Sequence, residues 1–121
     1  MTTQNDTSIL TRVRDLHDHI AQGRIIEALH EFYAEDCVLQ ENLNEPCRGR
    51  AANLQREEEW LASVAEFKGF EVRALAVDGN ISMVETSMDY VTTGGDAVHM
   101  EQVARAIWRD GKIVEERYYH G

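Results

Sequence analysis

Alternation of apolar and polar residues marks the C-terminal third of the chain as β-structure. Three strand-like runs lie within Ile81–Tyr119, separated by Gly94-Gly95 and by Asp110-Gly111. Two-residue Gly-Gly and Asp-Gly connections favour the hairpin turns whose backbone matches the twist of the flanking strands. The sequence therefore predicts an antiparallel meander that forms a long, curved surface.

The register of the first hairpin follows from its turn. If Gly94-Gly95 is the whole loop, Thr93 pairs with Asp96. Glu85 then lies opposite Ala104, and both faces of the hairpin mix apolar with polar residues. A solvent-facing side would be clearly polar. We therefore interpret one face as the wall of a pocket and the other as covered by another surface.

Helical spacing of apolar residues dominates the first half of the chain. It predicts a helix from Thr7 or Ser8 to Gly23, a second over residues 24–33 and a third over residues 51–65. Strands are predicted over residues 36–43 and 70–77, the second ending in a turn over residues 78–80. Helices that come early and a sheet that comes late indicate an α+β fold. We expect a frayed tail over residues 1–7 and a single domain over residues 8–121.

Composition narrows the classes of partner. The 121 residues carry a formal net charge of −10, and the 12 Lys and Arg residues are scattered. This argues against nucleic acid and against an anionic membrane surface, because both need clustered basic residues. No apolar run approaches the ~18 residues that span a bilayer. The negative net charge is most compatible with small molecules that are uncharged or cationic.

The sequence gives little support to a cofactor. Cys37 and Cys47 are the only cysteines, and no signal peptide precedes them. We expect free thiols in the cytoplasm, with one disulfide as the arithmetic alternative. The pair His17-x-His19 comes nearest to zinc-ligand spacing, but its members diverge on a helix. We therefore predict neither a metal nor a cofactor.

Three short stretches carry a likeness to a known family. They are Ala34-Glu35-Asp36 before the first strand, the turn Pro46…Arg48-Gly49, and residues 108–114, Trp-Arg-Asp-Gly-Lys-Ile-Val. With the element order, the chain resembles the superfamily of nuclear transport factor two, ketosteroid isomerase and the SnoaL-like polyketide cyclases, from about residue 8 to residue 120. The resemblance implies a curved antiparallel sheet wrapped around N-terminal helices, a cone-shaped, cystatin-like α+β barrel with a pocket at its open end. It also implies a homodimer that packs through the outer face of the sheet.

Ketosteroid isomerase supplies a chemical expectation. In that enzyme an Asp base moves a proton while a Tyr and a protonated Asp hold the enolate oxygen. The resemblance places the base at Glu41, on the first strand between Leu39 and Leu43. The other two positions fall near Leu16 and Ala104, whose side chains donate no hydrogen bond. Enolate chemistry in this chain would therefore need other donors.

The resemblance also indicates which face of the meander looks inward. The catalytic candidates are Glu41, Glu85, Glu116, Tyr118 and His120. The candidates for ligand contacts are His17, Leu39, Trp60, Met83, Met100, Gln102 and Trp108. Apolar walls with a few convergent polar groups are typical of a small-molecule site.

Glutamates that share a partly dry cavity raise one another's pKa. One protonated carboxylic acid beside one carboxylate makes a general acid and base pair. The alternative is that Glu85 and Glu116 lie at a wet rim or pair with nearby arginines. Tyr118 could instead be a structural residue in the core or at the rim. His120 could instead lie on the surface.

Other polar residues are expected outside the site. The run Arg56-Glu57-Glu58-Glu59 is most simply the solvated face of the third helix. His30 and His99 are expected to lie outside the cavity.

Two functions stay open at this point. The first is an enzyme of small apolar molecules that works by proton abstraction next to a carbonyl, or by cyclisation, dehydration or epoxide opening, with Glu41 as the base. The second is a binding module of the same fold without chemistry, whose cavity holds a metabolite or whose dimer face recruits a protein, since a fold does not by itself define a function.

Overall fold

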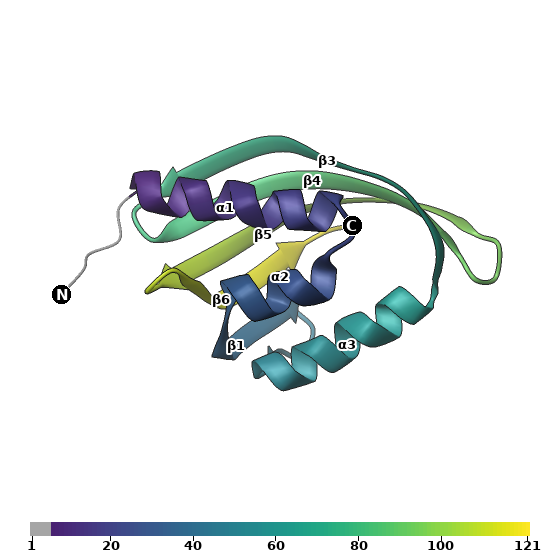
Figure 1. Cartoon of the computed structure of the whole chain (residues 1–121), viewed down its shortest axis with the longest axis horizontal. Helices are drawn as coiled ribbons and strands as arrows, with labels where there is room; N and C mark the ends of the chain where they lie inside the picture. The colour runs from purple at the N-terminus through teal and green to yellow at the C-terminus, as the bar shows by residue number, and fades with distance from the viewer. Residues whose placement is uncertain (1–5) are drawn as a thin grey trace.

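Three helices lie on one side of a curved sheet in this structure, a computed structural model that describes the backbone of residues 6–121 (Figure 1). The helices are α1 (Asp6–Ala21), α2 (Ile25–Phe32) and α3 (Arg50–Ala62). All three were predicted. Helix α1 already includes Thr7 and Ser8, so neither is its cap, and residues 1–5 of the predicted tail lie outside the described residues.

The sheet has six strands, which run in the order β2-β1-β6-β5-β4-β3. Their bounds are β1 Tyr33–Glu41, β2 Cys47–Arg48, β3 Val64–Asp78, β4 Ile81–Thr92, β5 Ala97–Arg109 and β6 Lys112–Tyr119. The two-residue strand β2 was not predicted, and β3 begins six residues earlier than expected, at Val64 instead of Phe70.

The α+β fold class is confirmed, but the sheet differs from the expected one in two ways. Strands β1 and β6 run parallel while every other pair is antiparallel, so the sheet is mixed. The edge strands β2 and β3 do not pair with each other, so the sheet is open rather than a closed barrel. Parallel neighbours need a long connection, and here the connection from β1 to β6 contains α3 and three strands of the meander.

The β4–β5 hairpin has a different register from the predicted one. Thr92 N–H donates to Asp96 O at 2.8 Å, so the loop between them has three residues and not two. Gly95 supplies the left-handed conformation that this loop requires, with φ +89°. As a result Thr86 pairs with Gln102, and Glu85 with Val103 instead of Ala104. A slip of one residue moves every side chain of a strand to the opposite face.

The other predicted two-residue turn is confirmed. Asp110 and Gly111 both have positive φ, 54° and 79°, and Arg109 pairs with Lys112 across them. Two consecutive residues with positive φ are the mark of the type I′ turn that Asp-Gly favours.

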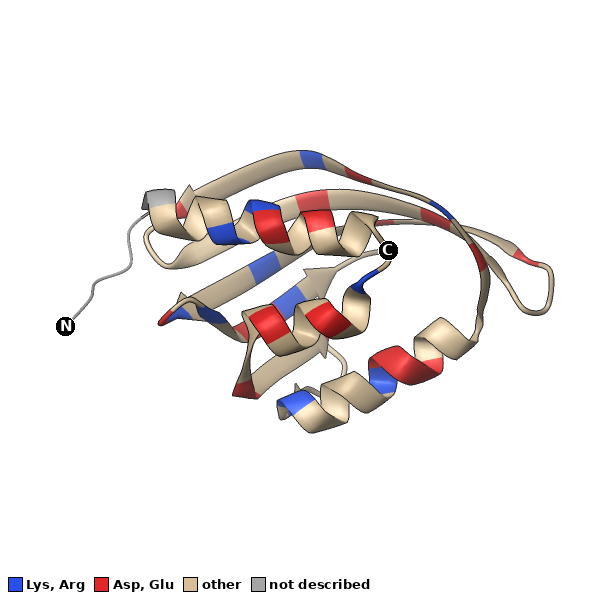
Figure 2. Ribbon diagram, in the orientation of Figure 1, with Lys and Arg blue, Asp and Glu red and all other residues tan. Residues whose placement is uncertain are grey.

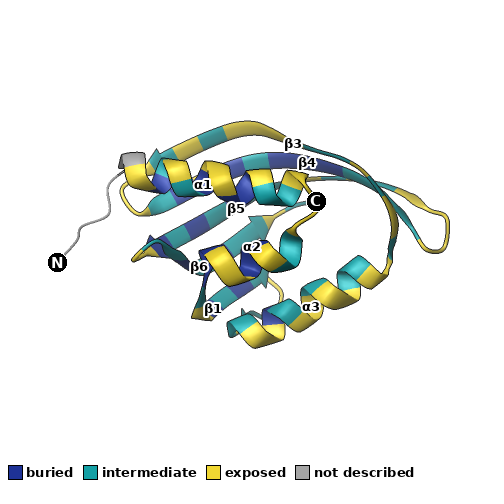
Figure 3. Cartoon of the chain, viewed as in Figure 1, coloured by how far each residue is buried: buried dark blue, intermediate teal, exposed yellow. Residues whose placement is uncertain are grey.

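The core lies between the helices and the middle of the sheet (Figure 3). Ile9 and Val13 of α1 and Phe32 of α2 are buried there against Trp108 and Ile113. Trp108 is 1% exposed and donates its indole N–H to Ser82 Oγ at 3.0 Å. The predicted ligand contact of Trp108 is therefore wrong, because its side chain belongs to the core.

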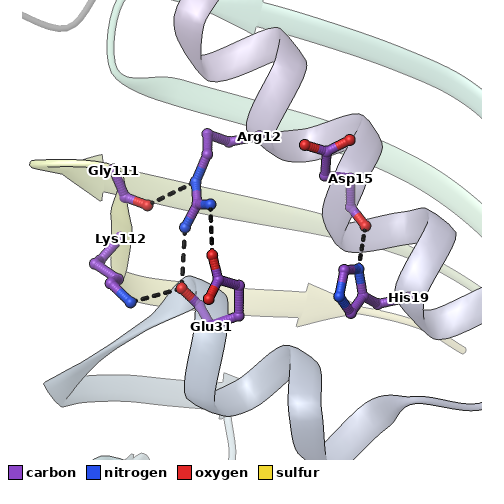
Figure 4. A network of polar contacts seen from close by, with 6 residues as sticks. All are labelled: Arg12, Asp15, His19, Glu31, Gly111 and Lys112. Carbon is purple, nitrogen blue, oxygen red and sulfur yellow. Dashed lines mark hydrogen bonds and ion pairs between the residues drawn. The ribbon is translucent and has the colours of Figure 1, made fainter.

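Arg12 ties α1 to the end of α2 and to the β5–β6 turn (Figure 4). Its guanidinium donates to Gly111 O at 3.0 Å, to Glu31 O at 2.9 Å and to Glu31 Oε1 at 3.1 Å. Lys112 Nζ donates to the same Glu31 carbonyl at 2.6 Å. Cations at the last carbonyls of a helix satisfy groups that have no partner within the helix. Elsewhere on the helices both signs of charge are mixed (Figure 2).

Arg12→Leu is expected to lower the free energy of unfolding by about 1–2 kcal/mol, because the part-buried carbonyl oxygen of Gly111 loses its charged donor and the ties to Glu31 are lost as well. Urea denaturation measures the change. Arg14→Leu is the matched control on the exposed side of the same helix, and a shift within about 0.5 kcal/mol is expected for it. Equal losses in the two variants would contradict a specific role for Arg12.

Candidate functional site

A cavity of about 640 Å³ lies between the three helices and the inner face of the sheet. This volume is in the range of small-molecule sites. Most of its wall is apolar, from Leu16 and Ile20 on α1 to Phe70, Met88 and Met100 on the strands. The polar groups are few, so their positions decide what the cavity can do.

Pairing of β1, β6 and β5 places the main polar groups side by side. Leu39 is the neighbour of Glu116, and Glu41 is the neighbour of Tyr118. On the other side of β6, Ala106 lies beside Glu116 and Ala104 beside Tyr118. Because these two alanines are small, they leave space next to the carboxyl group of Glu116 and the hydroxyl of Tyr118. The predicted register had instead placed Ala104 opposite Glu85.

Glu116 is the centre of a buried hydrogen-bonded unit. It is 4% exposed, and its Oε1 accepts hydrogen bonds from the hydroxyls of Tyr33 and Tyr118. Tyr33 is the first residue of β1, and Tyr118 lies two residues after Glu116 on the same face of β6. All three residues line the cavity. We call them the Glu116–tyrosine unit.

Burial raises the pKa of Glu116 to about 7, because a charged carboxylate is poorly solvated there. The two tyrosine hydroxyls oppose the rise by stabilising the charge, and the nearby Glu57 adds to it. Burial and the charge of Glu116 also raise the pKa values of Tyr33 and Tyr118 well above that of a free tyrosine. The tyrosines therefore stay protonated, while Glu116 exchanges a proton near neutral pH. Since Oε1 already accepts two hydrogen bonds, that proton belongs on Oε2.

Glu41 and His120 form a second polar pair in the cavity wall, with Glu41 Oε1 3.4 Å from His120 Nε2. The chain end is held in place, since His120 N–H donates to Asn42 Oδ1 at 2.9 Å. Arg117 Nε donates to Asn42 O at 2.8 Å, which ties the end of β6 to the end of β1. His120 is thus part-buried in the wall and not on the surface, which was its alternative placement.

Helix α3 contributes Arg56, Glu57, Glu59 and Trp60 to the cavity. The run 56–59 was predicted as a solvated face, and Arg56, Glu58 and Glu59 are indeed exposed, whereas Glu57 is part-buried and, like Arg56 and Glu59, lines the cavity. Residues three and four apart share a helix face, so the position of Trp60 was the signal that Arg56 and Glu57 look the same way. Burial raises the pKa of Glu57, Arg56 opposes the rise, and Glu41 adds to it.

Asn53 fixes the start of α3 relative to the sheet. Its side-chain amide donates to Cys47 O at 3.1 Å and to Gly49 O at 2.8 Å, and the residue is 2% exposed. This anchor sets which face of α3 looks into the cavity.

Most of the predicted site residues line the cavity. Those that do are Glu41, Glu116, Tyr118, His120, His17, Leu39, Trp60, Met100 and Gln102. Met83 and Glu85 do not, because the one-residue slip in the hairpin turns them to the outer face and brings Thr86 and Met88 inward. Glu85 therefore cannot contact a ligand in this cavity, nor can Met83, which is 47% exposed.

Tyr33 is the residue that sequence reasoning missed. The prediction placed it at the end of a helix, whereas it begins β1. Extending the alternation of Cys37, Leu39 and Glu41 backwards along the odd-numbered positions would have put Tyr33 on their face.

Other features of the predicted chemistry can be placed as well. Both cysteines are free thiols, and His30 and His99 are exposed outside the cavity. Among residues 8–121, whose side chains the structure describes, no three His, Cys, Asp or Glu side chains lie together as metal ligands. No helix in this described part is long and apolar enough to cross a bilayer.

Comparison with known proteins identifies the family. The sequence model of the SnoaL-like domain matches residues 13–116, which is most of the chain. The chain belongs to the SnoaL-like family. None of the curated proteins compared with it gives a significant match.

Solved structures agree with this assignment. A putative SnoaL-like polyketide cyclase from Mesorhizobium loti is 25% identical, with 93% of this chain and 98% of that chain covered and a TM-score of 0.77. A putative SnoaL-like polyketide cyclase from Jannaschia sp. CCS1 is 16% identical, with coverage of 98% and 88% and a TM-score of 0.83. A LEH-like epoxide hydrolase from M. tuberculosis is 16% identical, with coverage of 96% and 84% and a TM-score of 0.79. The SnoaL-like fold of this chain is therefore shown. At these low identities, its chemistry has to be inferred from the residues of the cavity.

Glu116→Gln is expected to stabilise this SnoaL-like protein at pH 8. A pKa of about 7 in the folded state against 4.5 for a free Glu means that folding favours the protonated form, and the difference is worth on the order of 3 kcal/mol. Below about pH 4.5 Glu116 is protonated in both the folded and the unfolded state, so it does not lower the free energy of unfolding. Stability therefore falls as pH rises from about 4.5 to 7, and it stays lower above that. Urea denaturation from pH 4 to pH 8 should show the advantage of the variant growing over this window, and a pH-independent difference would contradict the assignment.

Proposed function

We propose that this protein is an enzyme that moves a proton at the carbon next to the carbonyl of a small, neutral, mostly apolar compound. The observation that carries the proposal is the buried Glu116–tyrosine unit at the wall of an apolar cavity. A group whose pKa lies near the working pH is an effective general acid or base, and a pKa of about 7 gives Glu116 that property.

The proposed reaction uses both polar pairs of the cavity. Glu41, next to His120, takes the proton from carbon, and the electron pair of the broken C–H bond forms the C=C bond of an enol. Glu116 donates its Oε2 proton to the carbonyl oxygen in the same step, and the tyrosine hydroxyls stabilise the carboxylate that forms. Glu41 then returns its proton to the same or a conjugated carbon while the enol O–H proton goes back to Oε2 of Glu116, which gives the starting ketone or an isomer and restores both carboxyl groups.

The charges in the cavity support a neutral substrate. Its wall carries the carboxyl groups of Glu41, Glu57, Glu59 and Glu116 and the single guanidinium of Arg56. An added carboxylate or phosphate would meet like charges in a poorly solvated space. The cyclases and the epoxide hydrolase with similar structures are named for reactions of small molecules, which supports this substrate class.

Deuterium exchange tests the chemistry without knowledge of the natural substrate. The probe is 1-tetralone, a neutral bicyclic ketone, incubated with the protein in D₂O and followed by the loss of the ¹H NMR signal of the CH₂ next to the carbonyl. We expect the protein to accelerate this loss, and Glu116→Gln and Glu41→Gln each to slow the catalysed rate by about 10²–10⁴-fold, as is typical of a lost acid or base.

Glu85→Gln is the matched control, since this carboxylate lies on the outer face of the sheet. The control should exchange at the wild-type rate. Equal rates in the wild type and both site variants would overturn the proposal and favour a binding module, in which the Glu116–tyrosine unit only ties β1 to β6. One observation favours that alternative: Tyr33 and Tyr118 both donate to Glu116, so each hydroxyl already has a partner within the protein.

The outer face of the sheet supports a second part of the proposal, a homodimer. Met83 and Tyr119 are exposed there at 47% and 41%, beside the half-buried Val103. Exposed apolar side chains of this size are more often found at interfaces than on free surfaces.

Light scattering should therefore give twice the mass of the chain at micromolar concentration. Met83→Glu is expected to shift the mass towards the monomer, because the new carboxylate would be buried in the interface. Glu71→Gln, an exposed substitution on the edge strand β3, should leave the mass unchanged. A monomeric wild type would refute the dimer.

A further inference from the structure

His17 on α1 lines the cavity but takes no part in the proposed proton transfer. It is 9% exposed, and its ring stacks on Phe70 with the centroids 6.0 Å apart and the planes at 17°. Burying a polar ring in an apolar wall costs free energy unless the ring makes hydrogen bonds.

One ring nitrogen of His17 is already engaged. Nδ1 lies 2.8 Å from the backbone oxygen of Val13, one turn earlier in the helix. A carbonyl oxygen only accepts hydrogen bonds, so Nδ1 must carry a proton. Within residues 8–121 the other nitrogen, Nε2, has no hydrogen-bond partner, and it lies across the ring from the helix backbone.

The charge state of the ring follows from its surroundings. Burial lowers the pKa of His17, while the bond to Val13 and the charge of Asp18 oppose the shift. The ring is therefore neutral at pH 7. A neutral imidazole with its proton on Nδ1 has a lone pair on Nε2.

The position of His17 sets it apart from the acid end of the cavity. Phe70, on which it stacks, pairs with Met88, and Met88 pairs with Met100 of β5. Tyr118 lies beside Ala104, four residues farther along the same strand. Four residues of a strand span roughly 13 Å. A two-ring molecule with a hydrogen bond at each end covers a comparable distance.

We propose that Nε2 of His17 accepts a hydrogen bond from the ligand, and that it selects ketones carrying a hydroxyl or N–H group at the end away from the carbonyl. The inference deepens the proposed function and rests on it, because it requires the cavity to take a small ketone. It adds a polar group that the substrate must have.

His19 is a natural control within the same helix. Its Nδ1 makes the same bond to the backbone four residues earlier, 2.8 Å from Asp15 O (Figure 4). Its ring meets the edge of Phe32 at 5.1 Å and does not line the cavity. The two histidines therefore share their local bond and differ in access to a ligand.

The tautomer can be measured on the unmodified protein. With ¹⁵N-labelled histidine, NMR at pH 7 should show His17 with its proton on Nδ1 and none on Nε2. This is the less common neutral form of a free imidazole, so the result would show that the bond to Val13 O holds the tautomer in place. A proton on Nε2 would overturn the inference, since that nitrogen would then be a donor.

Binding of two matched ketones tests the selection. NMR titration should show that 6-hydroxy-1-tetralone binds about three- to tenfold tighter than 6-methoxy-1-tetralone, which has no donor, as expected for one net hydrogen bond. The preference should disappear in His17→Phe and persist in His19→Phe. Failure of the hydroxyketone to bind, or an unchanged preference in His17→Phe, would overturn the inference.

These outcomes are separable from those of the exchange experiment. A preference that depends on His17 without any deuterium exchange refutes the proposed chemistry and leaves the selection in place. Exchange that proceeds without the preference refutes the selection alone.

Discussion

Parallel pairing of β1 with β6 is the constraint on which the site depends. It joins the start of the sheet to the end of the chain, and it sets Leu39 beside Glu116 and Glu41 beside Tyr118. Every polar group of the proposed reaction lies on one of these two strands or, in the case of His120, directly after the end of β6. The pairing is secured at its far end by Asn42, which bonds to Tyr118, Arg117 and His120.

This arrangement buries the carboxyl group of Glu116, and burial makes its charged form less stable. Glu116 is poorly solvated, and the two tyrosine hydroxyls offset only part of the cost of its charge. Natural cores avoid such groups unless they have a task, because an apolar residue of the same size is often more stable. Two other polar groups of the cavity follow the same logic, since burial lowers the pKa of His17 and raises that of Glu57, which favours their uncharged forms.

The helices form one wall of the cavity, and the sheet forms the other. Helix α1 contributes His17 and apolar side chains, and Arg12 holds this helix against α2 and the β5–β6 turn. Helix α3 presents charged residues and Trp60, which makes an edge contact with Tyr90 of β4 at 5.2 Å. The helices therefore supply His17, Trp60 and most of the charged side chains of the cavity, while the proposed acid and base lie on the sheet.

The sequence by itself determined the element order, the α+β class and much of the site, because periodicity and turn residues act locally. Asp110-Gly111 encodes its turn in two residues, and the alternation along β1 and β6 places Glu41, Glu116 and Tyr118 on one face without any knowledge of the partner strands. The family resemblance came from the same local stretches. Only the tertiary structure decided the register of β4, since a three-residue loop and a two-residue loop both suit Thr-Gly-Gly-Asp, and a single residue separates Glu85 from the cavity. Only packing could reveal Tyr33 as a partner of Glu116 across 83 residues of chain, and only the orientation of α3 could turn a charged run towards the cavity. These features depend on contacts between elements that are distant in sequence, so local patterns could at most indicate the face on which Tyr33, Arg56 and Glu57 lie and not the partners that they meet there.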